Sequence, residues 1–324
     1  MSDIIEKKQN SFEKKRKKNI FKSQPFYLLV IILVAGLIVS LTNPNFLKLN
    51  NIMNIFTQSS VFGIITLASA VVLISGGIDL SVGQMMSFSC CIITKLIING
   101  TDPAVAVLIG ILVATGCGLI NGAIVSYSKC PPFIITLGMT GVYTGGALMV
   151  TDGIIINVPS SIKLFGEGMV GFMPIAVIIF LVACILVYFL LTRTRVGRRL
   201  YAAGGNEEAA LYSGINVRLY KFLVYGFGGL LVGIASLVLL DRLGSANAVM
   251  GQGYELEAIA AAVIGGVSLS GGKGSIIGAF FGVLLLGVIS NGLNIIGVNP
   301  YLQELILGAI IVIAVVASNL GKKK

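Results

Sequence analysis

The sequence predicts an all-α protein: a polytopic membrane helix bundle of about ten transmembrane spans, with the N- and C-termini cytoplasmic. Of its 324 residues, 56% are hydrophobic and 11% are charged, and the mean hydropathy of +0.97 lies far above that of soluble domains. Apolar stretches of about 17 residues or more recur along the chain, which suits helices crossing a hydrocarbon core of about 30 Å. A membrane barrel would instead show alternation in segments of about ten residues.

The predicted transmembrane domain occupies residues 25–320, between a basic tail at 1–24 and a basic end at 321–324. A cleaved signal peptide is the competing interpretation of the start, but the basic region is long and no A-x-A-like site follows the first apolar stretch. The ten predicted spans are Phe26–Leu41, Phe56–Ile74, Val82–Ile98, Ala104–Tyr127, Phe133–Val150, Pro174–Leu191, Tyr220–Leu240, the short Ala258–Leu269, Ile276–Ile296 and Tyr301–Ser318.

The distribution of basic residues predicts the orientation. With the N-terminus inside, 19 of the 23 basic residues fall on the cytoplasmic side, which is the bias of the positive-inside rule. The remaining four are Lys48, Lys95, Lys163 and Arg242. The net charge of +10 therefore reflects short segments between apolar spans, and it does not indicate nucleic-acid binding.

Two glycine-rich interruptions break the apolar pattern, at 75–83 (SGGIDLSVG) and at 270–274 (SGGKG). Irregular backbone at membrane depth is tolerated only inside protein or beside a water-filled cavity, so the first interruption is predicted to be an element of a transport pathway. Each opens on Ser-Gly-Gly, which is compatible with an internal duplication, but the similarity is weak and leaves the question open.

A polar island at 191–218 separates two long apolar segments. Asn206 suits a helix N-cap, Glu207 and Glu208 suit the first turn, and Gly214 suits a left-handed C-terminal cap. The pattern predicts a helix of about two turns, Asn206–Ser213. A helix that short is marginal alone, so we expect it to dock on a partner; an ordinary solvated loop is the alternative.

No catalytic constellation is visible. The chain has no histidine, and its five cysteines lack metal-ligand spacing, so no metal site is predicted. The glycines around Lys273 fail the phosphate-loop pattern, because Val267 stands at the first glycine position and Gly274 follows the lysine. An enzyme is not expected, and no cofactor is predicted on this chain.

Polar residues within the spans are candidates for the solute pathway. Asp79 is the one acidic residue expected near the inner end of the bundle core, where a carboxylate suggests function, although Asp79 or Ser81 could simply cap the third span. Neutral groups there would suit an uncharged polyhydroxylated solute, and helix-to-helix hydrogen bonding is an equally good explanation. The predicted pathway residues are Asp79, Ser81, Asn121, Thr136, Tyr143 and Asn291.

Energy coupling is missing from the spans, since no His, Lys or Arg is expected at mid-membrane. Together with the polar island, this indicates a permease driven by a docked motor. The island segment Gly204–Val217 resembles the coupling loop of the ribose-type permeases of bacterial ABC sugar importers. Residues 75–83 and 253–274 are similar to two other marked stretches of that family, and the resemblance extends from about Pro25 to the C-terminus.

The resemblance implies a subunit of an importer for ribose or a similar sugar in the bacterial cytoplasmic membrane. It implies a homodimer in membrane lipid, a cytoplasmic ABC ATPase that carries ATP and Mg, an extracytoplasmic sugar-binding protein, and a coupling loop at 192–219. A branched-chain amino-acid permease or an ATPase-independent transporter is the alternative. The residues implied to couple to the ATPase are Gly205, Asn206, Glu207, Glu208, Ala209, Ala210, Leu211, Tyr212, Ser213 and Gly214.

One departure concerns the solute. After Thr136 and the residues that follow it, the family often has an arginine just before a glycine, whereas this chain has Thr144 before Gly145. The fold is unaffected by this difference, but the identity of the sugar is left open.

Overall fold

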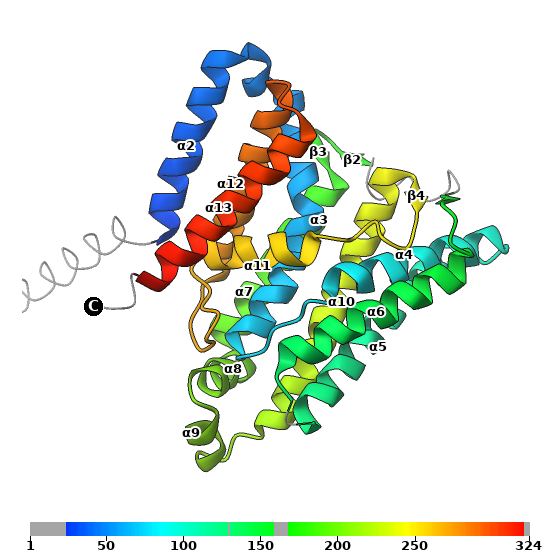
Figure 1. Cartoon of the computed structure of the whole chain (residues 1–324), viewed down its shortest axis with the longest axis vertical. Coiled ribbons are helices and arrows are strands. Elements are labelled where there is room, and N and C mark those ends of the chain that lie inside the picture. The colour runs from blue at the N-terminus through cyan, green and yellow to red at the C-terminus, as the bar shows by residue number, and fades with distance from the viewer. Residues whose placement is uncertain (1–23, 129, 159–167, 321–324) are drawn as a thin grey trace, which may run out of the picture.

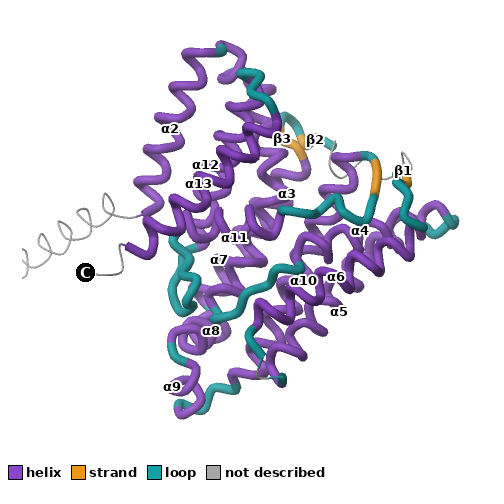
Figure 2. Tube along the Cα trace, viewed as in Figure 1, coloured by secondary structure: helices purple, strands orange, loops and turns teal. Residues whose placement is uncertain are grey.

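The computed structural model describes residues 24–128, 130–158 and 168–320, and within them helices dominate (Figures 1 and 2). Both basic ends, Lys129 and Lys163 lie outside the described residues, and with them many of the charges behind the orientation prediction. The long helices are α2 Gln24–Thr42, α3 Leu49–Ile74, α4 Val82–Ile98, α5 Pro103–Tyr127, α6 Pro132–Thr151, α7 Ile175–Arg193, α10 Val217–Leu243, α12 Ile276–Ile295 and α13 Pro300–Leu320.

Shorter elements connect them. A 3₁₀ turn, η1 (Pro44–Leu47), follows α2, and two-residue strands pair as β1 (Ile156–Asn157) with β4 (Ser245–Ala246) and as β2 (Met169–Val170) with β3 (Met173–Pro174). The remaining short helices are α8 (Arg195–Gly205), α9 (Glu207–Tyr212) and α11 (Tyr254–Ile264).

Among the described residues, seven helices are long and apolar enough to cross a membrane: α2, α3, α5, α6, α7, α10 and α12. The all-α polytopic membrane fold is therefore confirmed. Each of the ten predicted spans corresponds to a helix, but α4 and the apolar part of α13 are shorter than these seven, and α11 has only 11 residues. The count of ten spans and the orientation of the termini stay predictions.

The core forms around α3 and α10. In their most apolar stretches, 89% of α3 and 78% of α10 is buried, compared with 11% of α2 and 17% of α6. Helix α3 packs against α7, α10, α11 and α12, and it runs through the centre of the molecule (Figure 1). The outer helices present their apolar faces outward, as expected for a protein surrounded by lipid.

Glycine pairs allow some of the helices to approach closely, as the small-xxx-small pattern predicts. A Cβ atom at Gly118 would lie 3.0 Å from backbone atoms of Gly229, so α5 and α10 meet backbone to backbone. At Gly141 and Gly145 on α6, by contrast, nothing among the described residues lies within 4 Å of an added Cβ.

Contacts between distant segments define the two ends of the bundle. At one end, the Gln24 side chain donates to the carbonyl oxygen of Ile264 (2.8 Å), and the Gly272 N–H donates to the Ile74 carbonyl (2.9 Å). At the opposite end, Asn43 at the close of α2 donates to the Ile295 carbonyl (3.0 Å). Helices α8 and α9 adjoin the first of these ends, which we call the α9 end.

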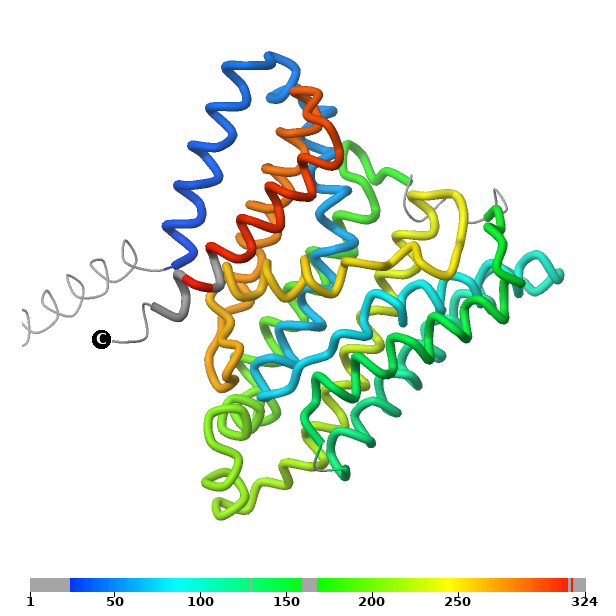
Figure 3. The backbone as a smooth tube through the Cα atoms, viewed as in Figure 1, coloured from blue at the N-terminus to red at the C-terminus, as the bar shows by residue number. Residues whose placement is uncertain are grey.

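The interruption at 75–81 runs back from the end of α3 into the bundle, where α4 begins (Figure 3). The first turn of α4 meets the loop before α11: the Gly251 N–H donates to the Ser87 hydroxyl (2.8 Å), and a Cβ at Gly83 would collide with the Gly251 carbonyl. The two short apolar helices α4 and α11 therefore start beside each other.

Candidate coupling surface and buried polar network

The arginine-rich flank of the polar island forms a helix, α8, which the sequence analysis did not predict. Thr194 caps it: the threonine hydroxyl accepts a hydrogen bond from the Gly197 N–H (3.2 Å). Its arginines stand on the exposed face, while Gly197, Leu200 and Ala203 are buried. The island is thus a pair of helices, not one helix within a loop.

The predicted short helix exists as α9. The Asn206 side chain accepts from the Ala209 N–H (2.9 Å), as expected for an N-cap, and Gly214 is left-handed with φ of 79°. The Glu207 carboxylate forms an ion pair with Lys221 of α10 (2.6 Å). This pair ties α9 to a long helix of the bundle.

Helix α9 presents apolar side chains to the outside. Ala210 packs with Ala203 of α8 and Val217 of α10 in a small separate core. On the other face, Leu211 is 51% exposed and Tyr212 is 92% exposed. An aromatic side chain held almost fully outside the fold by a capped and anchored helix is typical of a surface that a partner covers.

The end of α8 contacts both interruptions through glycine backbone. A Cβ atom at Gly204 would collide with the Ile74 carbonyl and would lie 2.8 Å from the Gly272 nitrogen. Gly271, in turn, lies directly against Gly76 and Gly204. We call this contact of Gly76, Gly204, Gly271 and Gly272 the glycine junction. It joins α8, and through it α9, to both irregular segments.

A side chain anchors the same contact. The Tyr201 hydroxyl of α8 donates to the Gly274 carbonyl (2.9 Å), and burial raises the pKa of Tyr201, which keeps the hydroxyl protonated and able to donate. The junction therefore has one side-chain tether beside its backbone contacts.

Five of the six predicted pathway residues come together in a buried polar network. The Asp79 carboxylate accepts from the Ser81 hydroxyl (2.6 Å) and the Ser81 N–H (2.9 Å), and Asn121 of α5 donates to Ser81 (2.8 Å). The Tyr143 hydroxyl of α6 donates to the Asn121 carbonyl oxygen (2.7 Å). Thr136 accepts from the Leu80 N–H (3.1 Å). The network fixes the irregular segment 78–81 between α5 and α6.

The interpretation that Asp79 or Ser81 caps the third span is wrong. Ser81 stands at the N-cap of α4 but has αR backbone angles, and neither side chain bonds to the first turn of the helix. The Asp79 carboxylate instead bonds within the loop and to α5.

Asn291 lies apart from this network. It exchanges side-chain hydrogen bonds with Asn51 of α3, at 2.9 and 3.1 Å. Its place in a common pathway with the other five is not supported by their positions, and contact of any of the six with solute stays a prediction.

The fold is that of a polytopic membrane protein with a short capped helix, α9, exposed at one end. Residues 51–315 match a family described as branched-chain amino acid transport system / permease component, and the chain belongs to this family.

Individual relatives cover nearly the whole chain. The ribose import permease protein RbsC of Bacillus subtilis is 41% identical over 94% of this chain and 93% of its own. The D-allose transport system permease protein AlsC of Escherichia coli is 40% identical over 92% and 91%, and the galactose/methyl galactoside import permease protein MglC of the same species is 37% identical over 96% and 98%. No solved structure gives a significant match. The resemblance to ribose-type sugar importer permeases is confirmed.

Besides α8, two further features were missed by sequence reasoning. The glycines of the junction were noted as chain breaks, but nothing in the sequence says that Gly204 faces both of them. Sequence reasoning also missed a cavity beside α11, because the residues that line it follow no spacing pattern. Ser59 of α3 and Ser290 of α12 are among these residues.

Proposed function

We propose that this chain is the transmembrane subunit of an ATP-driven importer for a monosaccharide, ribose or a similar sugar, in the bacterial cytoplasmic membrane. Two copies form a homodimer, a cytoplasmic ABC ATPase hydrolyses ATP with Mg, and an extracytoplasmic sugar-binding protein delivers the solute. The relatives named for ribose, allose and galactoside import support the sugar class.

The observation that carries the coupling mechanism is the exposed face of α9. Leu211 and Tyr212 project from a helix that is capped by Asn206 and anchored by the ion pair between Glu207 and Lys221. We propose that this face sits in a groove of the ATPase and that movement of the ATPase displaces α9 and α8 together. The glycine junction passes this displacement to the segments at 75–81 and 270–274, which opens the pathway to one side of the membrane at a time.

The overall proposal predicts ATP-dependent sugar uptake. The chain would be expressed with its ATPase and binding protein in cells lacking ribose uptake, and accumulation of radiolabelled ribose, allose, methyl galactoside and leucine would be measured. We expect uptake of at least one sugar, loss of that uptake on ATP depletion, and persistence when a protonophore is added with ATP maintained. Uptake of leucine alone would favour the alternative, a branched-chain amino-acid permease. The description of the matched family names that class of solute. Uptake that survives ATP depletion would reject the proposal that an ATPase drives transport.

The exposed face of α9 gives a separate prediction. Tyr212→Ala and Leu211→Ala are expected to lower sugar uptake roughly threefold to tenfold and to weaken copurification of the ATPase, because truncating an anchor in a partner's pocket costs about 2 kcal/mol or more. Tyr212 is 92% exposed, so its removal leaves the fold intact.

Tyr27→Ala provides the matched control, since Tyr27 is also an exposed tyrosine (54%) but lies on α2. Reversing Glu207 is a poorer test, because it would break the internal ion pair with Lys221. Equal uptake by Tyr212→Ala and the parent would remove α9 from the proposed interface.

A further inference from the structure

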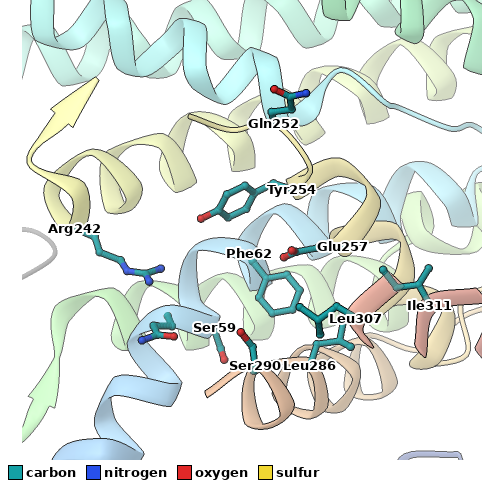
Figure 4. A pocket seen from close by; sticks show the side chains of 12 residues that line it. Ser59, Phe62, Arg242, Gln252, Tyr254, Glu257, Leu286, Ser290, Leu307 and Ile311 are labelled. Atoms are coloured by element: carbon teal, nitrogen blue, oxygen red, sulfur yellow. The ribbon is translucent and has the colours of Figure 1, made fainter. Parts of the chain in front are cut away.

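We propose that the cavity between α3, α11, α12 and α13 is a binding site for the transported monosaccharide within the transmembrane domain. This inference rests on the proposed function and adds the place where this chain holds the solute. The cavity has a volume of about 240 Å³ (Figure 4). That is below the roughly 300–1,000 Å³ of pockets for drug-sized ligands, and it equals about eight waters at ~30 Å³ each, which suits one small sugar.

The lining of the cavity carries polar groups that lack partners within the chain. Within the described residues, the polar side chains that line the cavity form no hydrogen bond or ion pair with the rest of the chain. They come from α3, α10, the loop before α11, α11 and α12: Gln58, Ser59, Arg242, Gln252, Glu257 and Ser290. The polar groups of the Asp79 network differ from these, because they form hydrogen bonds with one another. Unused donors and acceptors from five segments that converge on one space favour a polar occupant.

Ser59 is the strongest single indicator. It is 1% exposed, and its hydroxyl has no partner. It lies in the third turn of α3, roughly 15 Å along the helix axis from its first residue. A buried hydroxyl without a hydrogen bond costs about 1–3 kcal/mol, so a ligand hydroxyl that pairs with it recovers that free energy.

The mixture of polar side chains in the cavity wall indicates the chemical class of the ligand. Arg242 can only donate, a Glu257 carboxylate can only accept, and the serine hydroxyls and glutamine amides do both. A sugar hydroxyl both donates and accepts, so one neutral polyhydroxylated molecule can satisfy all of these groups. Phe62, Leu286, Leu307 and Ile311 supply apolar walls, and the Tyr254 ring lies among the polar groups (Figure 4).

The position of the cavity connects it to the moving parts. Tyr254 and Glu257 belong to α11, whose chain continues directly into the interruption at 270–274. That interruption reaches the glycine junction through Gly271 and Gly272. A displacement of α8 can therefore change the wall of the cavity that α11 forms.

The experiment compares two serines of one helix. Ser59→Ala and Ser69→Ala each remove a buried hydroxyl without a partner from α3, but only Ser59 lines the cavity. In the assembled transporter with its ATPase and binding protein, radiolabelled ribose uptake at saturating binding protein is expected to fall at least fivefold for Ser59→Ala and for Glu257→Gln. Ser69→Ala is expected to retain the parent rate.

A direct binding measurement accompanies uptake. The chain has no tryptophan, so Phe62→Trp places a single reporter in the cavity wall. Titration of the purified full chain in lipid nanodiscs with ribose, allose and methyl galactoside is expected to change its emission, and Ser59→Ala in that background is expected to raise the half-saturating concentration at least threefold.

The outcomes separate the two proposals. A parent transporter that imports none of the sugars rejects the proposed function and, with it, the sugar as occupant. Normal uptake by the parent together with full uptake by Ser59→Ala and Glu257→Gln rejects the cavity alone. Equal losses for Ser59→Ala and Ser69→Ala would also reject it, because they would show an effect on packing and not on solute.

Discussion

Replacing Gly204 with alanine is expected to abolish most sugar uptake while leaving the protein in the membrane. The added Cβ would collide with the Ile74 carbonyl and lie 2.8 Å from the Gly272 nitrogen, although these two groups are hydrogen-bonded to each other at 2.9 Å. Backbone atoms cannot rotate away, so α8 must separate from one or both irregular segments. We expect uptake to fall more than tenfold and ATP hydrolysis by the assembled complex to continue without transport.

Gly205→Ala is the matched control for this prediction. Both glycines end α8, and alanine is the better helix former at either position, so helix propensity cannot explain a difference. The nearest atom to a Cβ at Gly205 is the Gly272 Cα at 3.8 Å, an ordinary van der Waals contact. Uptake would be compared at equal membrane abundance. If the two variants transported equally well, the glycine junction would not transmit movement.

Replacing Asp79 with alanine is expected to destabilise the fold by about 3 kcal/mol or more. The change removes the acceptor for the Ser81 N–H and hydroxyl, and burial of these groups prevents water from replacing it. The expected result is a thermal unfolding midpoint in detergent several degrees below that of the parent. Asp79→Asn keeps an acceptor oxygen and is expected to lower the unfolding midpoint less than Asp79→Ala does.

Asp102→Ala is the control for Asp79→Ala. Asp102 also accepts hydrogen bonds from backbone N–H groups, those of Ala104 and Val105, but it caps the exposed start of α5. Loss of an exposed cap costs about 1 kcal/mol. A midpoint for Asp79→Ala equal to that of Asp102→Ala would show that the buried network contributes no more than a surface cap.

The elements that could be predicted from the sequence are those with local causes. Hydropathy located every long helix, and the ends agree within a few residues except that α3 begins at Leu49 and not at the predicted Phe56. Asn206 and Gly214 gave both ends of α9, because a cap and a left-handed glycine act within one turn. The short eighth span was predicted at 258–269, whereas α11 is Tyr254–Ile264, since left-handed Gly266 follows its end and the chain continues as an irregular segment.

The parts that escaped prediction depend on which surfaces meet. Arg195 and its neighbours looked like orientation charges, and the buried face of α8 becomes visible only against α3 and α7. Asn291 shares its residue type with Asn121, but it pairs with Asn51 because α12 packs on α3 there. Polar character within a span predicts a hydrogen bond, whereas the partner is decided by the packing of the bundle.

Helix α11 has a consequence for how the chain enters the membrane. Its 11 residues extend about 16 Å, roughly half of a hydrocarbon core of about 30 Å, and the glycine-rich segment that follows carries Lys273. Such a segment cannot partition into lipid by itself during synthesis. It needs the surfaces of α3 and α12, and α12 is made after it. We therefore expect the stretch from Tyr254 to Gly274 to reach its final position only after α12 has been synthesised.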